Sequence, residues 1–99
     1  MIVVRDVFHL KYGKAREAKA LWTEGKAMFA KFDKSVDYRV MFDLVGPSYT
    51  MATEATFKSL ADMEAEFAGT FGNEEFEQWY RKFTPLVERG YREIWTLFE

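Results

Sequence analysis

The segment Tyr38–Phe57, YRVMFDLVGPSYTMATEATF, decides the fold. It contains two strand-like runs, Tyr38–Val45 and Tyr49–Phe57, separated by Gly46-Pro47-Ser48. Gly, Pro and Ser are typical turn residues, so this pattern predicts a β-hairpin. The hairpin lies near the middle of the 99-residue chain, and the segments on its two sides indicate which fold it belongs to.

A strand and a helical pattern flank the hairpin on each side. Apolar residues recur at spacings of three and four from Lys14 to Phe32, which predicts an amphipathic helix. Ile2–Leu10 is rich in β-branched and aromatic residues and predicts a strand. After the hairpin, a second helical stretch precedes a closing strand, Tyr91–Phe98. The order β-α-β-β-α-β predicts an α+β, ferredoxin-like domain: a four-stranded antiparallel sheet with helices on one face.

The second helical stretch contains its own start and stop signals. Ser59 is an N-cap candidate, with an acidic residue three positions later. Gly69 and Gly72 predict a break, after which Asn73 is a second N-cap candidate. We expect Gly90 to end this helical region before the closing strand.

Two apolar stripes follow helical spacing. The first is predicted to pack on the sheet as core, and it consists of Leu21, Trp22, Met28, Phe29 and Phe32. Gly25 lies within it, and we expect either a close contact there, with a strand side chain as the neighbour, or a local bend of the helix. The second stripe can be core or can line a hydrophobic ligand site, and both interpretations remain open for Phe71, Phe76, Trp79, Tyr80 and Phe83.

Composition narrows the functional classes. The net charge is −2, with 16 acidic and 14 basic residues interspersed, so we expect neither a nucleic-acid partner nor binding to anionic membranes. The chain has no cysteine and one histidine, which excludes thiol chemistry and makes a metal site or another cofactor unexpected. No apolar run has the length of a signal or transmembrane segment. We therefore expect a cytoplasmic protein.

Strand residues alternate between the two faces of a sheet. The more uniformly apolar set is predicted to face the helices, and it consists of Val4, Phe8, Leu10, Tyr38, Val40, Phe42, Leu44, Met51, Thr53, Ala55, Phe57, Ile94, Thr96 and Phe98. The opposite set contains both charged and apolar side chains, some of them large. It consists of Arg5, Val7, His9, Arg39, Met41, Asp43, Ala52, Glu54, Glu93 and Trp95. Asp6 falls among the apolar set, which predicts a bulge or an edge position there.

The mixed face is the predicted functional surface, because a few polar groups beside bulky apolar ones are typical of a ligand pocket. In an enzyme, His9 or Asp43 would act as the base and Arg5 would stabilise a developing oxyanion. The substrate-binding candidates are Trp95, which would stack on the ligand, and Glu54, Met41 and Arg39.

A structural interpretation of the same face stands beside the functional one. The charges can pair with one another at the interface of a dimer, as a network of Arg5, Arg39, Asp43, Glu54 and Glu93. Because the first and third strands are central neighbours in this fold, Arg5 and Glu54 are the expected direct pair. An open cavity would favour the enzyme, and salt bridges filling the space would favour the structural dimer.

The opening Val3–Ala18, VVRDVFHLKYGKAREA, resembles the start of dimeric α/β-barrel proteins of the NIPSNAP-like and antibiotic-biosynthesis-monooxygenase-like kind. In that group an apolar-Lys-Pro-Gly-Lys turn leads into the first helix, and here Tyr12 replaces the proline. The segments Asp43–Tyr49 and Phe76–Trp79 are also similar to the NIPSNAP-like side.

The resemblance implies a single dimeric α/β-barrel domain over residues 1–99. Two sheets of a homodimer would close over a shared cavity, burying the face with Met41, Ala52 and Trp95. Some relatives are cofactor-independent monooxygenases or isomerases. The expected function is binding of a small apolar or aromatic compound, with oxygenation or isomerisation as the candidate reactions. The alternative is a non-catalytic structural or binding dimer.

Overall fold

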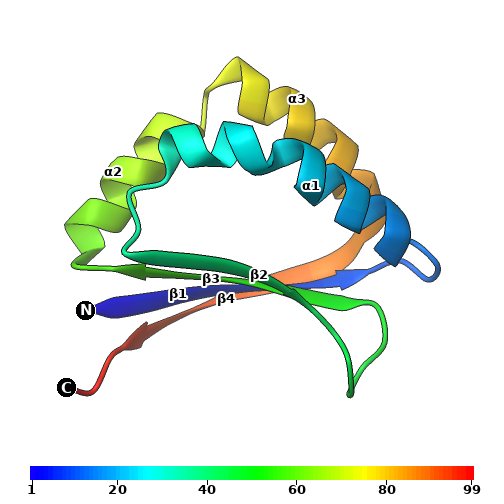
Figure 1. Cartoon of the computed structure of the whole chain (residues 1–99), viewed down its shortest axis with the longest axis horizontal. Helices are drawn as coiled ribbons and strands as arrows, with labels where there is room; N and C mark the ends of the chain where they lie inside the picture. Colours follow the sequence, from blue (N-terminus) through cyan, green and yellow to red (C-terminus); the bar gives the residue numbers. More distant parts are fainter.

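A computed structural model describes residues 1–99 and contains a single four-stranded sheet with three α-helices on one face (Figure 1). The sheet order is β2-β3-β1-β4, and every neighbouring pair is antiparallel. The predicted α+β ferredoxin-like fold is therefore confirmed. The elements are β1 (Ile2–Leu10), α1 (Ala15–Phe32), β2 (Asp37–Phe42), β3 (Thr50–Phe57), α2 (Leu60–Thr70), α3 (Glu74–Phe83), the 3-10 turn η1 (Thr84–Leu86) and β4 (Val87–Thr96).

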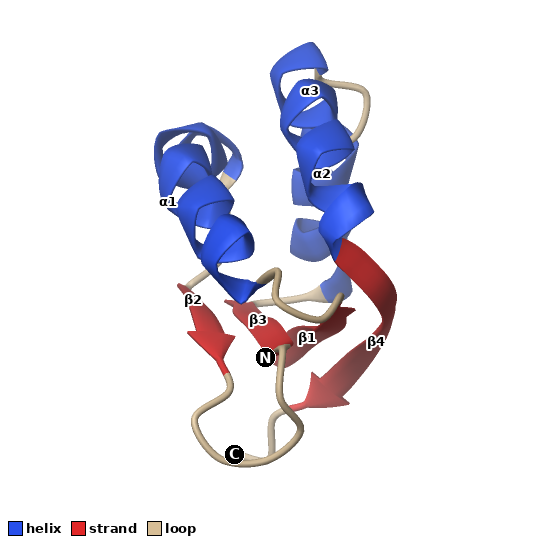
Figure 2. Cartoon of the chain, turned by 90° about the vertical axis from the view of Figure 1, so that its right-hand side faces the viewer, coloured by secondary structure: helices blue, strands red, loops and turns tan.

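The second helical region consists of two helices, as its glycine break indicates. Ser59 caps α2 by accepting a hydrogen bond from the Asp62 backbone N–H at 3.2 Å. Asn73 caps α3 in the same way through the Phe76 N–H, also at 3.2 Å. Viewed along the helices, α1 stands above the β2 edge, and α2 and α3 stand above the β4 side (Figure 2).

The closing strand begins earlier than predicted. β4 starts at Val87 and not at Tyr91, so Gly90 lies inside the strand and the prediction that it stops a helix was wrong. The helical region already ends in η1, where Pro85 stands in its first turn. Gly90 has a packing role instead, because a Cβ there would lie 3.0 Å from the Val7 carbonyl oxygen and 3.1 Å from the Phe8 ring.

Asp6 sits in the regular part of the central strand β1, opposite Thr53 and Arg92. The irregularity in β1 falls between His9 and Leu10, so the expected bulge or edge position at Asp6 was wrong. Asp6 is tolerated on the helix side because the Arg92 guanidinium pairs with it at 2.6 Å.

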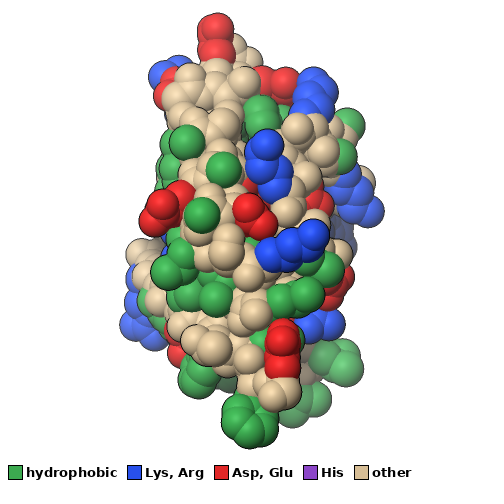
Figure 3. Space-filling model, turned by 90° about the vertical axis from the view of Figure 1, so that its left-hand side faces the viewer, with side chains coloured by type: hydrophobic (Ala, Val, Ile, Leu, Met, Phe, Trp, Pro, Cys, Tyr) green, Lys and Arg blue, Asp and Glu red, His purple; other side chains and the backbone are tan.

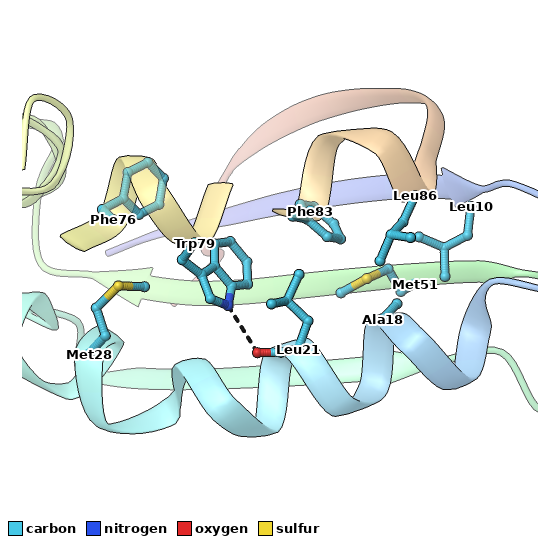
Figure 4. Close-up of a cluster of buried hydrophobic side chains, with 9 residues drawn as sticks. All are labelled: Leu10, Ala18, Leu21, Met28, Met51, Phe76, Trp79, Phe83 and Leu86. Carbon is cyan, nitrogen blue, oxygen red and sulfur yellow. Dashed lines mark hydrogen bonds between the residues drawn. The ribbon is translucent and has the colours of Figure 1, made fainter. Parts of the chain in front are cut away.

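The larger core cluster joins α1, α3 and the sheet, and it buries Leu10, Ala18, Leu21, Met28, Met51, Phe76, Trp79, Phe83 and Leu86 (Figure 4). Trp79 fixes the two helices together, because its indole N–H donates to the Leu21 carbonyl at 2.9 Å. Gly25 is the close-contact point, as predicted, but its neighbour is a helix side chain: a Cβ on Gly25 would lie 2.7 Å from Trp79 Nε1.

Candidate functional site

The face of the sheet away from the helices, called the outer face here, carries a row of alternating charges across all four strands. In strand order the row reads Arg39, Glu54, Arg5 and Glu93. Glu54 binds Arg39 and Arg5 at 2.8 Å each, and Arg5 also lies 3.6 Å from Glu93. The predicted pairing of Arg5 with Glu54 is thereby confirmed.

Electrostatics within this charge row are dominated by Glu54, whose side chain is mostly buried between the two arginines. The hydrogen bonds from Arg39 hold the pKa of the Glu54 carboxyl below its ordinary value, against the opposing effect of burial, and the bonds from Arg5 add to the lowering. The same contact raises the pKa of the Arg39 guanidinium. Glu54 is therefore ionised at neutral pH, and both of its carboxylate oxygens are already paired within one chain.

The remaining predicted site residues also lie on the outer face or at its edge. Asp43 accepts a hydrogen bond from the Thr50 backbone N–H at 3.0 Å and so stabilises the hairpin. The His9 ring lies 6.4 Å from the Tyr91 ring. Trp95 and Met41 are 54% and 37% exposed. In the single chain these residues form an open surface and not an enclosed pocket.

A cavity of about 1370 Å³ lies instead on the helix side of the sheet, and we call it the inner cavity. Most of its lining is hydrophobic, with aromatic walls from α1, β2, α2 and α3 such as Trp22, Phe29, Phe42, Phe67 and Phe76. Trp22 and Phe29 stack with their ring centres 5.0 Å apart. Among the predicted site residues, only Arg39 reaches this cavity.

The inner cavity contains an ion pair between Asp6 and Arg92. Arg92 donates through Nε at 2.6 Å and through Nη2 at 3.2 Å to the two oxygens of Asp6. Its guanidinium also lies 4.6 Å from the centre of the Phe67 ring. These contacts fix the plane of the guanidinium. Sequence reasoning missed Arg92, although the misfit of Asp6 on an apolar face was the available signal.

Tyr38 and Glu66 form the second polar region of the inner cavity. Burial raises the pKa of the Tyr38 phenol, and the nearby carboxylates of Asp6, Glu66 and Asp33 raise it further. Burial also raises the pKa of Glu66, although the Lys34 backbone N–H donates to its carboxylate at 2.5 Å. Tyr38 is consequently a neutral phenol at physiological pH and can donate a hydrogen bond.

No group of three or more histidine, aspartate or glutamate side chains is placed to hold a metal ion. None of the helices has both the length and the apolar character needed to cross a membrane. At the end of the molecule where both termini lie, apolar side chains are exposed on the lower half (Figure 3), and the terminal Leu97 and Phe98 are among the exposed apolar residues.

Solved structures with the same fold cover nearly the whole chain. A NIPSNAP family protein from Agrobacterium tumefaciens matches with a TM-score of 0.87 and 19% identity, over 99% of this chain and 93% of that one. A NIPSNAP domain protein from Burkholderia xenovorans also gives 0.87, with 10% identity, over 99% and 95%. A putative antibiotic biosynthesis monooxygenase from Nitrosomonas europaea gives 0.78, with 12% identity, over the full length of both.

No protein-family model matches the sequence, and no curated protein matches it either. The resemblance of the sequence to NIPSNAP-like and antibiotic-biosynthesis-monooxygenase-like proteins is thus confirmed for the fold.

Proposed function

We propose that this chain forms a homodimer through its outer face and binds a small apolar or aromatic compound in the inner cavity. The observation that carries the ligand proposal is the inner cavity, with its volume of about 1370 Å³ and its aromatic walls. Ligand pockets of drug-sized molecules have volumes of roughly 300–1,000 Å³ and predominantly apolar linings. The available space is therefore ample for a compound of a few rings.

Two hydrogen-bond donors would orient such a ligand. Arg92 is held by Asp6 and stacked on Phe67, so its remaining N–H groups are pre-positioned. Tyr38 contributes a neutral phenol O–H. Asp6 already neutralises the Arg92 charge, which favours an uncharged acceptor on the ligand, such as a carbonyl, over a carboxylate.

The catalytic part of the proposal concerns oxygenation or isomerisation without a cofactor, with His9 or Asp43 as base and Arg5 as oxyanion stabiliser. These three residues lie on the outer face. A reaction site that uses them would therefore form between two copies of the chain, where Glu54, Trp95, Met41 and Arg39 would line it.

A non-catalytic dimer is the second candidate. It is favoured by the charge row, in which Glu54 is shared between Arg5 and Arg39. Salt bridges already occupy the polar groups that a substrate on the outer face would need. Under this alternative the outer face is an interface and nothing else.

Binding can be tested with N-phenylnaphthylamine, a neutral aromatic probe whose fluorescence rises in apolar surroundings. We expect saturable binding to the wild type. Val40→Trp, which fills the inner cavity from β2, should weaken it about tenfold or more. Ala27→Trp is the matched control, because Ala27 is an exposed α1 residue outside the cavity lining.

A readout on the wild type avoids dependence on the folding of the Val40→Trp variant. The Trp22 indole N–H cross-peak in an NMR spectrum should shift on addition of the probe, because Trp22 lines the cavity. Absence of saturable binding, or an unmoved Trp22 signal with equal effects of both tryptophan variants, would contradict a ligand in the inner cavity.

A further inference from the structure

We infer that the ligand of the inner cavity is an elongated amphiphile with an anionic head group, namely a long-chain carboxylate, whose head lies between Lys19 and Lys26 where the cavity opens between α1 and β2. This inference rests on the ligand site proposed above. It adds the chemical class of the ligand and the direction in which the ligand lies, and it follows from the charges along the cavity lining.

Lys19 and Lys26 stand at the opening of the inner cavity on the β2 side. Both line the cavity and both are exposed to solvent, as is Thr23 between them. α1 stands above the β2 edge of the sheet (Figure 2), and the Lys19 ammonium lies 5.3 Å from the centre of the Phe42 ring on β2. Lys26 follows two helical turns later, about 10 Å along the helix axis and on nearly the same side of α1. We call this opening the α1–β2 mouth.

Neither lysine of the α1–β2 mouth has an anionic partner in the chain. The remaining lysine of α1, Lys31, lies on another side of the helix and pairs with Glu75 of α3 at 3.1 Å. Lys19 and Lys26 make no ion pair. The two ammonium groups that border the cavity are therefore free to bind an anion from outside the chain.

The acidic side chains of the cavity lining are engaged elsewhere or stand on another element. Both oxygens of Asp6 accept hydrogen bonds from Arg92. Glu66 accepts from a backbone N–H of the loop between α1 and β2 at 2.5 Å, and Asp33 accepts from the backbone N–H two residues later at 2.9 Å. The remaining acidic residue of the lining, Glu77, belongs to α3. The positive charge at the α1–β2 mouth is thus left uncompensated, which favours an anionic ligand there.

The floor of the cavity is long enough for an extended apolar chain. One row of lining side chains crosses the strands in the order β2, β3, β1 and β4, and it consists of Val40, Thr53, Asp6 and Arg92. Three strand spacings separate its ends, which is about 14 Å. Next to the α1–β2 mouth the lining is apolar, with Val40 on the floor and Trp22 on α1. A chain that enters there meets hydrophobic surface directly behind its head group.

The distribution of negative charge sets the direction of the ligand. Arg92, at the far end of the row, is another cationic group, but both oxygens of Asp6 already bind it, at 2.6 and 3.2 Å. A ligand carboxylate beside Arg92 would also lie close to Asp6, which would repel it. At the α1–β2 mouth no carboxylate pairs with either lysine, so the anionic head is favoured at this end of the cavity.

The two lysines provide selectivity and a modest part of the affinity. Ion pairs at exposed positions are weak, because water and salt screen them. Burial of the alkyl chain supplies most of the affinity, whereas the lysines discriminate between an anionic head group and a neutral one on the same chain. The decisive quantity is therefore the preference for the charged compound over its neutral counterpart.

Displacement of bound N-phenylnaphthylamine by dodecanoate and by dodecanol tests this preference, since both compounds have the same chain length. The readout is the ratio of the half-displacing concentration of dodecanol to that of dodecanoate, measured at pH 7 and low ionic strength. Because it is taken within one protein, a general change in the cavity cancels. Lys19→Gln/Lys26→Gln should lower the ratio about fivefold relative to the wild type, as expected for the loss of two exposed ion pairs.

Lys11→Gln/Lys58→Gln is the matched control. Both lysines are exposed, both lie outside the cavity lining, and their replacement changes the net charge by the same amount. The ratio should stay within about twofold of the wild-type value, because distant exposed charges are screened. In the wild type itself, raising the NaCl concentration to about 0.5 M should lower the ratio toward that of Lys19→Gln/Lys26→Gln, for the same reason.

The outcomes separate the head-group site from the ligand site. If N-phenylnaphthylamine does not bind the wild type, the ligand site and this inference are both overturned. If the probe binds but Lys19→Gln/Lys26→Gln keeps the wild-type ratio, the inference is overturned and the ligand site stands. An equal fall in the control would assign the preference to net charge, and a fall in Arg92→Met alone would place the carboxylate at the far end of the cavity. Either result would also overturn the inference.

Discussion

The two faces of this sheet have the same four strands but opposite chemistry. On the helix side, apolar side chains pack against α1 and α3, and the partly buried charge of Asp6 is paired with Arg92. On the outer face, charged and apolar residues alternate in rows, and large side chains such as Trp95 and Tyr91 are about half exposed. The comparison teaches that the helix side stabilises the folded chain, whereas the outer face leaves large apolar side chains exposed, which fits the homodimer proposed above.

The largest expected effect contrasts one aromatic residue from each face. Phe83 is 1% exposed within the core, so Phe83→Ala should lower the free energy of unfolding by about 3–5 kcal/mol. Trp95→Ala should cost less than about 1 kcal/mol in the folded monomer, because Trp95 is 54% exposed. Urea unfolding at concentrations where the chain is monomeric provides the comparison. Similar losses in the two variants would break the distinction between the faces.

The contact between Gly25 and Trp79 gives a smaller effect on the helix side. Gly25→Ala forces a methyl group to within 2.7 Å of a buried indole that is fixed by its hydrogen bond to Leu21, and overpacking of this kind costs about 1–3 kcal/mol. Gly69→Ala in α2 is the matched control, because a Cβ there meets nothing within 4 Å. The control should be neutral or stabilising by up to about 1 kcal/mol. Thermal unfolding would measure both, and a neutral Gly25→Ala would show that the helices can separate freely.

The smallest expected effect concerns the outer face and depends on pH. The hydrogen bonds from Arg39 and Arg5 lower the folded-state pKa of Glu54 from its ordinary value of 4.5. Their stabilisation is therefore fully present above pH 4.5 and is lost as the pH falls through the lowered value. Because both arginines are screened by water, Glu54→Gln should cost only about 1 kcal/mol at pH 7.

Measuring the free energy of unfolding as a function of pH below 4.5 checks whether the stabilisation comes from the ionised Glu54 carboxylate. Glu54→Gln should flatten the loss of stability below pH 4.5. Glu88→Gln is the control, since Glu88 is an exposed glutamate on β4 that makes no ion pair, and it should leave the profile close to that of the wild type. An unchanged acid limb in Glu54→Gln would mean that the charge row contributes nothing to the stability of the folded chain.

Local signals in the sequence determined most of the fold. Alternation in Thr50–Phe57 set which residues face the helices, because every second side chain of a strand lies on the same face of the sheet. Ser59 and Asn73 start α2 and α3, since a side-chain oxygen at an N-cap satisfies a free backbone N–H wherever the helix lies. The pairing of Arg5 with Glu54 followed from strand order alone.

Tertiary structure alone decided the features that depend on contacts between distant segments. Nothing local shows that Gly25 makes room for Trp79, or that Asp6 is paired by a residue 86 positions later. The inner cavity likewise depends on how far α1, α2 and α3 stand from the sheet, which the packing of whole side chains determines. Periodicity thus determined which face of each element is buried, and only three-dimensional packing decided what each buried face meets.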